Sequence, residues 1–341
     1  MPVSLEQYKK FDLENSEILA ILLGIFTFYI VFSIPELYVD ECEGFGHCFD
    51  FDRRMGRLYV WNTDNFFTDF RHSLHFGLLV FSNEIFGNYK VLVLVSSTSL
   101  ILISYLFTKK ITGKRYAGVL AIGVLLGSKI FYTYDTSVTY PSFWSTFYIL
   151  SLYLIVKKPY LSILPYFLSI PMKMLTILYL PANLAFIAFL NIDKKSKIKQ
   201  ILIYVSIISL IVGIAYLVDE DLIESSFVVQ LNFKPYDFIS GIGDWANTYR
   251  FDVFGLFMLF IVICLLIMLK KVPYSKAVLL VIFLMLMTSP FLRGFSTYDN
   301  WPYRYLPIVT MVAIGFGLVV CNLDKIDFSR FSRRNNLSVK I

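Results

Sequence analysis

The chain has 341 residues, of which 57% are hydrophobic and only 16% are charged, and its formal net charge is +6. The charged fraction lies well below the roughly 25% of an average soluble protein, and the mean hydropathy is +0.65. A soluble fold could not shield this much apolar side chain from water. The composition therefore excludes a soluble globular enzyme, a disordered chain and a nucleic-acid-binding module.

Continuous apolar segments predict membrane-spanning helices, since one span needs about 20 mostly apolar residues. In chain order they cover about residues 17–37, 89–108, 116–132, 141–156, 159–171, 174–191, 200–217, 251–270, 277–291 and 304–322. The stretch from His75 to Phe86 is apolar but shorter, so we expect an interfacial or re-entrant piece there. We predict an all-α polytopic membrane protein of about ten transmembrane helices, with a single transmembrane domain over residues 1–341.

Two segments between the predicted spans are too long to be simple turns. They cover about residues 38–88 and 219–250, and loops of this length usually carry function. Residues 323–341 form a tail after the last predicted span. We therefore expect residues 38–88 to be a long first extracytoplasmic loop, residues 219–250 a second one, and residues 323–341 a cytoplasmic tail.

Basic residues concentrate in the connections that a ten-span path places on one side of the membrane. Twenty of the 31 Lys and Arg residues lie there: Lys9, Lys10, Lys109, Lys110, Lys114, Arg115, Lys157, Lys158, Lys194, Lys195, Lys197, Lys199, Lys270, Lys271, Lys276, Lys325, Arg330, Arg333, Arg334 and Lys340. Connections rich in Lys and Arg face the cytoplasm. We expect a multi-pass protein of the cell membrane with both termini in the cytoplasm, and no nucleic-acid partner is needed to explain the basic charge.

Two of the four cysteines, Cys42 and Cys48, flank the short stretch Glu-Gly-Phe-Gly-His in the first long segment. On an oxidising outer face, this pair predicts a disulfide that closes a small loop. Zinc held by His47 with another histidine or an acid is the alternative, but the sequence lacks a second Cys-x-x-Cys, and we predict no metal. Cys264 and Cys321 lie within apolar segments and are expected to be packing residues.

Six charged residues lie at or near the predicted outer boundary of the membrane: Asp40, Glu41, Asp135, Lys173, Arg293 and Arg304. Solvation of helix ends, or snorkelling of the basic side chains, explains each of them singly. Ionisable groups in this region are costly, however, and are candidates for function. A carboxylate can act as a general base towards a hydroxyl, and an arginine can hold a phosphate through two hydrogen bonds. Together these residues predict a site for a substrate with a hydroxyl and a phosphate, which could carry a lipid tail.

Several short motifs follow one another between residues 17 and 320. They are Tyr38-Val39-Asp40-Glu41, Arg71-His72-Ser73-Leu74-His75-Phe76, Ile85-Phe86-Gly87, Pro171-Met172-Lys173-Met174-Leu175, Leu180-Pro181-Ala182 and Tyr303-Arg304-Tyr305-Leu306-Pro307. Their order resembles that of integral-membrane glycosyltransferases of the GT-C type, in particular relatives of protein mannosyltransferases and lipid A aminoarabinose transferases. In that superfamily, an Asp-Glu pair after the first span opens a long outer loop, and an Arg-Tyr…Pro stretch begins a late span.

The resemblance implies a hexosyltransferase that takes a sugar from a polyprenyl phosphate, such as dolichyl phosphate, and uses no cofactor. The sugar would pass with inversion to a hydroxyl of a glycan, lipid or protein acceptor on the outer face of the membrane. Asp40 would be the general base, and Glu41 and Asp135 would support the acceptor or the base. The donor phosphate would be bound by Arg304, Arg293, Lys173 and Tyr305, and the acceptor side of the loop would carry His72 and His75.

Two other functions stay open. A transporter or flippase for a lipid-linked sugar often shows internal repeats and broken helices. The sequence shows no convincing repeat, although Pro171 breaks the apolar stretch between residues 159 and 191. A long acidic outer segment fits catalysis on the outer face better than alternating access. The other alternative is a non-catalytic membrane subunit of a larger complex.

Overall fold

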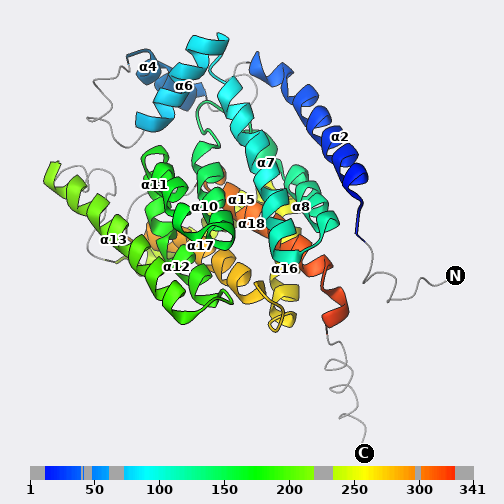
Figure 1. The fold of residues 1–341 in the computed structure, drawn as a ribbon. Coiled ribbons are helices and arrows are strands. Elements are labelled where there is room, and N and C mark those ends of the chain that lie inside the picture. Colours follow the sequence, from blue (N-terminus) through cyan, green and yellow to red (C-terminus); the bar gives the residue numbers. More distant parts are fainter. Residues whose placement is uncertain are drawn as a thin grey trace, which may run out of the picture.

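The computed structural model describes residues 12–39, 41, 48–60, 73–218, 233–295 and 301–326, and this part of the chain is helical without a strand (Figure 1). The elements in chain order are α2 (Asn15–Ser33), η1 (Pro35–Leu37), α4 (Cys48–Val60), α6 (Ser73–Phe86), α7 (Val91–Thr112), α8 (Arg115–Gly127), α9 (Lys129–Tyr134), α10 (Phe143–Lys157), η2 (Pro159–Leu161), α11 (Ile163–Met172), η3 (Met174–Tyr179), α12 (Leu180–Phe189), α13 (Lys194–Val218), α15 (Pro235–Phe251), α16 (Val253–Met268), α17 (Ser275–Phe295), η4 (Pro302–Tyr305), α18 (Leu306–Val320) and η5 (Leu323–Lys325).

Several of these helices are suited to a membrane. Among the described residues, four stretches are long and apolar enough to cross it: Asn15–Leu37, Val91–Thr112, Ser275–Phe295 and Pro302–Val320. The helices α15 and α16 meet at a bend of 114° and would add a fifth if the pair is one span. Shorter apolar helices include α8 and α10. The prediction of an all-helical protein with membrane-spanning helices is confirmed at this level, and the count of ten spans stays a prediction.

The two long segments between predicted spans contain helices of their own. Helices α4 and α6 lie within residues 38–88, and α15 (Pro235–Phe251) covers the second half of residues 219–250 and ends one residue beyond it. Helix α6 covers the apolar stretch that the sequence marked as too short for a span. In Figure 1, α4 and α6 lie together at the upper end of the helical bundle.

Helix α18 is the central element of the bundle. It contacts α7, α8, α16 and α17, and most of its residues are buried. A side chain on Gly317 would lie 2.4 Å from the Thr108 side chain and 2.6 Å from the Ala117 carbonyl oxygen. The glycine therefore permits the close approach of α18 to α7 and α8, which is typical of helix packing in membranes. Helix α2, in contrast, leaves most of its apolar side chains exposed.

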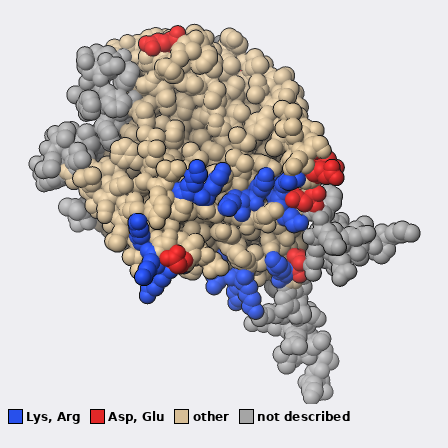
Figure 2. Space-filling view, viewed as in Figure 1, with Lys and Arg blue, Asp and Glu red and all other residues tan. Residues whose placement is uncertain are grey.

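Charge is distributed unevenly over the surface. Figure 2 shows Lys and Arg side chains over the lower half of one face, whereas a broad upper area of the same face carries almost no charge. The α7–α8, α12–α13 and α16–α17 connections lie at this lower end of the bundle, where α2 begins and α18 ends (Figure 1). The fold therefore gathers these Lys-rich connections at one end.

The end with the basic connections is expected to face the cytoplasm. Single cysteines would replace Ser196, next to three of the lysines at the start of α13, and Thr63, in the first long segment, in a chain without its native cysteines. A membrane-impermeant maleimide should label Thr63→Cys in intact cells and reach Ser196→Cys only after permeabilisation. The reverse pattern would show that the orientation is inverted.

Candidate functional site

The connection between α9 and α10 is fixed by buried polar contacts. Asp135, which is 1% exposed, accepts a hydrogen bond at Oδ2 from the Tyr29 hydroxyl of α2 over 2.8 Å. The Ser97 hydroxyl of α7 donates to the Asp135 carbonyl oxygen over 2.6 Å. The Thr136 hydroxyl donates to Glu36 Oε2 over 2.9 Å. These contacts tie the connection to both α2 and α7.

The Glu41 side chain also contacts the α9–α10 connection. Its buried carboxylate accepts hydrogen bonds from the Ser137 hydroxyl over 3.1 Å, from the Thr139 backbone N–H over 3.2 Å, and from the Val138 backbone N–H. The Ser137 hydroxyl in turn accepts from the Tyr140 backbone N–H over 3.0 Å. Both carboxylate oxygens of Glu41 therefore serve to hold residues 137–140 in place.

Lys173 lies at a break between two helical elements. Helix α11 contains Pro171 and ends at Met172, and Lys173 has extended backbone angles (φ −156°, ψ 107°) before η3 begins. Its Nζ donates to the Tyr303 hydroxyl oxygen over 2.7 Å and lies 4.7 Å from the centroid of that ring. The break therefore brings a lysine against the start of the last long helical stretch.

Arg304 contacts the same phenol oxygen. Its Nε donates to Tyr303 Oη over 3.2 Å, and Arg304 is 5% exposed. The Tyr179 hydroxyl donates to the Arg304 carbonyl oxygen over 3.2 Å, which anchors the backbone of η4 to η3. Two cationic groups that lie 131 positions apart in the sequence thus meet at one oxygen atom.

A small cavity lies beside these groups, and we call it the Tyr303 pocket. Its lining residues come from six elements and connections: His75, Thr139, Tyr140, Pro141, Phe143, Trp144, Met172, Lys173 and Tyr303. The cavity volume is about 10 Å³, which is room for about one water molecule. The Tyr140 ring stacks on the Tyr303 ring with centroids 4.2 Å apart. The Thr139 hydroxyl is buried and has no hydrogen-bond partner within the described residues.

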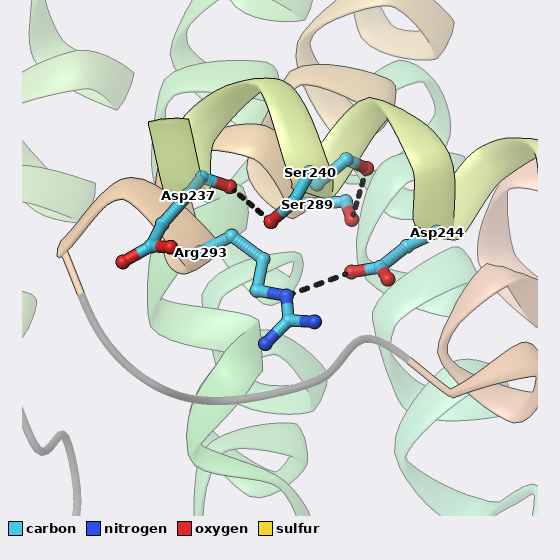
Figure 3. A network of polar contacts seen from close by, with 6 residues as sticks. Asp237, Ser240, Asp244, Ser289 and Arg293 are labelled. Atoms are coloured by element: carbon cyan, nitrogen blue, oxygen red, sulfur yellow. Dashed lines mark hydrogen bonds and ion pairs between the residues drawn. The ribbon is translucent and has the colours of Figure 1, made fainter. Parts of the chain in front are cut away.

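Arg293 lies in a separate contact between α15 and α17. Figure 3 shows its side chain extending from α17 towards Asp244 of α15, and Nε lies 3.5 Å from Asp244 Oδ2. The Ser289 hydroxyl donates to the Gly241 carbonyl oxygen over 3.2 Å. A side chain on Gly241 would lie 2.7 Å from Pro290 Cα, so the two helices approach closely here. In the described residues Arg293 thus contributes to the α15–α17 contact.

The other predicted site residues fall into two groups. His75 lines the Tyr303 pocket, and Tyr305 is buried in η4. Outside the described residues lie Asp40, Cys42, His47, His72 and the side chain of Cys48. The general base and the disulfide therefore stay predictions. Cys264 is exposed on α16, because the outward face of that apolar helix contributes surface rather than core.

The sequence reasoning missed several residues that shape the site. Tyr303 enters the sequence motifs only as the neighbour of Arg304, and no motif contains Tyr140 or Trp144. The dense aromatic stretch after Asp135 was the available signal. Asp252 was also missed: it is buried and accepts hydrogen bonds from the Ser128 hydroxyl, the Ile130 N–H and the Gly255 N–H. Asp252 thereby caps the N-termini of both α9 and α16 at the bend before α16.

Burial, together with the nearby charge of Glu36, raises the pKa of Asp135 to about 8. An unfolded chain ionises this carboxyl near its ordinary value of about 4. Between about pH 4 and pH 8 the folded state therefore holds a proton that the unfolded state lacks, and this residue lowers stability as the pH rises through that range. Above about pH 8 its contribution is constant.

The Asp135→Asn variant should lose this dependence, since the amide stays neutral and can still accept from Tyr29. Melting temperatures of the parent and the variant, measured in detergent from pH 5 to pH 8, should diverge in favour of the variant as the pH rises. A constant difference over this range would contradict the raised pKa.

The Tyr303 pocket has one cationic donor, Lys173, in its lining together with hydroxyl groups and aromatic rings, and Arg304 contacts the Tyr303 hydroxyl beside it. Lys173 and Arg304 can donate charge-assisted hydrogen bonds to an anionic oxygen. The rings of Tyr140 and Trp144 offer flat apolar surfaces.

Comparisons of the chain with protein-family models, with curated proteins and with solved structures find no match.

Proposed function

We propose that the protein is a GT-C-like glycosyltransferase that moves a hexose from a polyprenyl phosphate, such as dolichyl phosphate, to a hydroxyl of a glycan, lipid or protein acceptor. The observation that carries this proposal is the meeting of Lys173 and Arg304 at Tyr303 Oη beside an aromatic pocket. A half-buried lysine and a buried arginine that donate to the same oxygen atom form a strongly positive site, which favours an anionic ligand. A lysine and an arginine suit the phosphodiester of such a donor, and they suit equally the polyprenyl phosphate monoester that leaves.

The place of the pocket supports chemistry on the outer face of the membrane. Helix α6, which contributes His75 to the pocket, lies at the end of the bundle away from the basic connections (Figure 1). Under the positive-inside rule this is the extracytoplasmic end. The proposal includes the ten-span path, a cell-membrane location and both termini in the cytoplasm.

In the proposed reaction, Asp40 takes the proton of the acceptor hydroxyl while that oxygen attacks the anomeric carbon from the side opposite the phosphate. The bond between the anomeric carbon and the phosphate oxygen breaks, and its electron pair stays with the polyprenyl phosphate. Lys173 and Arg304 stabilise the charge of this leaving group. Glu41 and Asp135 support the site by holding the α9–α10 connection, whose residues Thr139 and Tyr140 line the pocket.

A lipid-phosphate-sugar transporter is the second candidate, and the break at Lys173 favours it. Discontinuous helices with charged residues at the break are frequent in the substrate sites of transporters. Both candidates require the same anion site, and they differ in whether the sugar leaves its lipid. Analysis of the lipid after incubation with an acceptor therefore separates them: a transferase releases free polyprenyl phosphate, and a transporter returns the intact sugar lipid.

The deciding experiment measures binding of a synthetic polyprenyl monophosphate to the purified protein in lipid nanodiscs. The Lys173→Met variant should bind it at least about 10-fold more weakly, since a hydrogen bond to a charged group contributes roughly 1.5–3 kcal/mol. Lys110→Met removes an equal charge from the exposed end of α7 and should bind as the parent does. Equal binding by the parent and Lys173→Met would overturn the proposed donor site.

A further inference from the structure

The Tyr303 hydroxyl accepts hydrogen bonds from two cationic groups, Lys173 in the pocket lining and the neighbouring Arg304. Lys173 Nζ lies 2.7 Å and Arg304 Nε 3.2 Å from its oxygen, and both are donors. Lys173 lies at the α11–η3 break, and Arg304 lies in η4. The Tyr179 hydroxyl of η3 donates to the Arg304 carbonyl oxygen and so links η3 to η4. Both donors are thus directed at an oxygen atom that belongs to the protein itself.

The space beside this oxygen is too small for an anionic group. The cavity has a volume of about 10 Å³, which holds about one water molecule, whereas a phosphate group carries four oxygens. The Tyr303 ring is itself buried between Tyr140, stacked at 4.2 Å, and Tyr134, in edge contact at 5.9 Å. A phosphate oxygen can therefore take the position between the two donors only if the Tyr303 side chain moves.

We propose that Tyr303 is a place-holder: its hydroxyl oxygen lies between Lys173 and Arg304 in the unliganded protein, and an oxygen of the phosphate group of a polyprenyl phosphate replaces it there. This inference rests on the proposed function, because it describes the same anion site. The buried Thr139 hydroxyl in the pocket lining supplies a further hydrogen bond to the incoming group.

The need to displace Tyr303 lowers the affinity of the protein for its ligand. A ligand that binds only when Tyr303 has moved shows an affinity reduced by the fraction of molecules in that state. The contacts of the phenol oxygen with two cationic donors favour the closed state. Loss of this oxygen should therefore tighten ligand binding, which is the opposite of the effect expected for a residue that binds the ligand.

The experiment compares Tyr303→Phe with the parent in nanodiscs, using a polyprenyl monophosphate as the probe. The affinity of Tyr303→Phe should rise by about 10-fold, on the scale of one charge-assisted hydrogen bond. The matched control is Tyr134→Phe, which removes a hydroxyl from the same aromatic cluster and should bind as the parent does. Arg304→Met, like Lys173→Met, should bind more weakly.

A second measurement checks that the variants are folded. Without ligand, Tyr303→Phe should melt below the parent, since two cationic donors lose their shared acceptor. With saturating ligand, its gain in melting temperature should exceed that of the parent, as tighter binding requires. Inorganic phosphate and a polyprenol without phosphate serve as further probes. If inorganic phosphate also binds, and the variants rank in the same order of affinity for it, the result would support the place-holder and assign the site to free phosphate.

Weaker or unchanged binding by Tyr303→Phe, with weaker binding by Lys173→Met, would overturn the place-holder and leave the proposed function in place. In that case Tyr303 is a ligand contact or has no part in binding. No binding of any phosphate probe by the folded parent would overturn both the place-holder and the proposed donor site.

Discussion

Sugar transfer by the Asp40→Asn variant is expected to fall by about 100- to 10,000-fold, which is the usual contribution of a general base. Asparagine keeps the size and the hydrogen-bonding capacity of the side chain but cannot take up the acceptor proton. Binding of the polyprenyl monophosphate should be retained, because the proposed phosphate site is formed by Lys173 and Arg304 and not by Asp40. The measurement is the rate of transfer from a radiolabelled polyprenyl phosphate hexose, with binding determined on the same preparation.

Asp52→Asn, on an exposed position of α4, is the matched control and should transfer sugar at the parent rate. Arg304→Ala should show the reverse of Asp40→Asn, with donor binding lost first. Transfer by Asp40→Asn at the parent rate would remove Asp40 as the base. Intact sugar lipid recovered from the parent in every assay would favour the transporter or the non-catalytic subunit.

Much of the helical framework follows from the sequence, because hydropathy reports the local requirement of a helix in an apolar medium. The predicted segment 89–108 corresponds to α7 (Val91–Thr112), which ends at Gly113 with a left-handed backbone (φ +72°). The segment 277–291 corresponds to α17 in the same way. In both cases a long uninterrupted apolar run is sufficient to define the helix.

The interruptions were harder to predict, since distant residues create them. The predicted segment 116–132 divides into α8 and α9 at Ser128. The Ser128 hydroxyl donates to Asp252, which lies 124 positions later. Hydropathy averaged over a window contains no information about such a contact. Pro171 indicates the break at Lys173, but nothing in the local sequence indicates that Lys173 contacts Tyr303.

The candidate site shows the same division between composition and geometry. Because it is costly to bury a charge, the charged residues within apolar segments are candidates for a site. Two of them, Lys173 and Arg304, do come together at Tyr303. This cost does not reveal which charges meet: Arg293, selected on the same grounds, pairs with Asp244 of α15. Glu41 was grouped with Asp40 as an acid of the site, yet its described contacts are with the backbone of the α9–α10 connection.

These contacts lead to a strong prediction for Glu41. In the Glu41→Ala variant, two backbone N–H groups and the Ser137 hydroxyl lose their acceptor in a buried place. Each buried donor left unpaired costs about 1–3 kcal/mol, so for three donors we expect the free energy of unfolding to fall by at least about 3 kcal/mol. The α9–α10 connection lines the Tyr303 pocket, and we expect its displacement to raise the KM for the donor by at least about 10-fold.

Glu41→Gln is the test that separates a positioning role from a catalytic one. The amide keeps one acceptor oxygen, so it should recover part of the melting temperature and part of the donor KM that Glu41→Ala loses, although it has no basicity. A residue acting as a base would behave differently: Gln and Ala would lower kcat alike and leave the melting temperature unchanged, as expected for Asp40→Asn. Measuring kcat, KM and the melting temperature for the three variants together therefore assigns the adjacent acids Asp40 and Glu41 to different tasks, or shows that they share one.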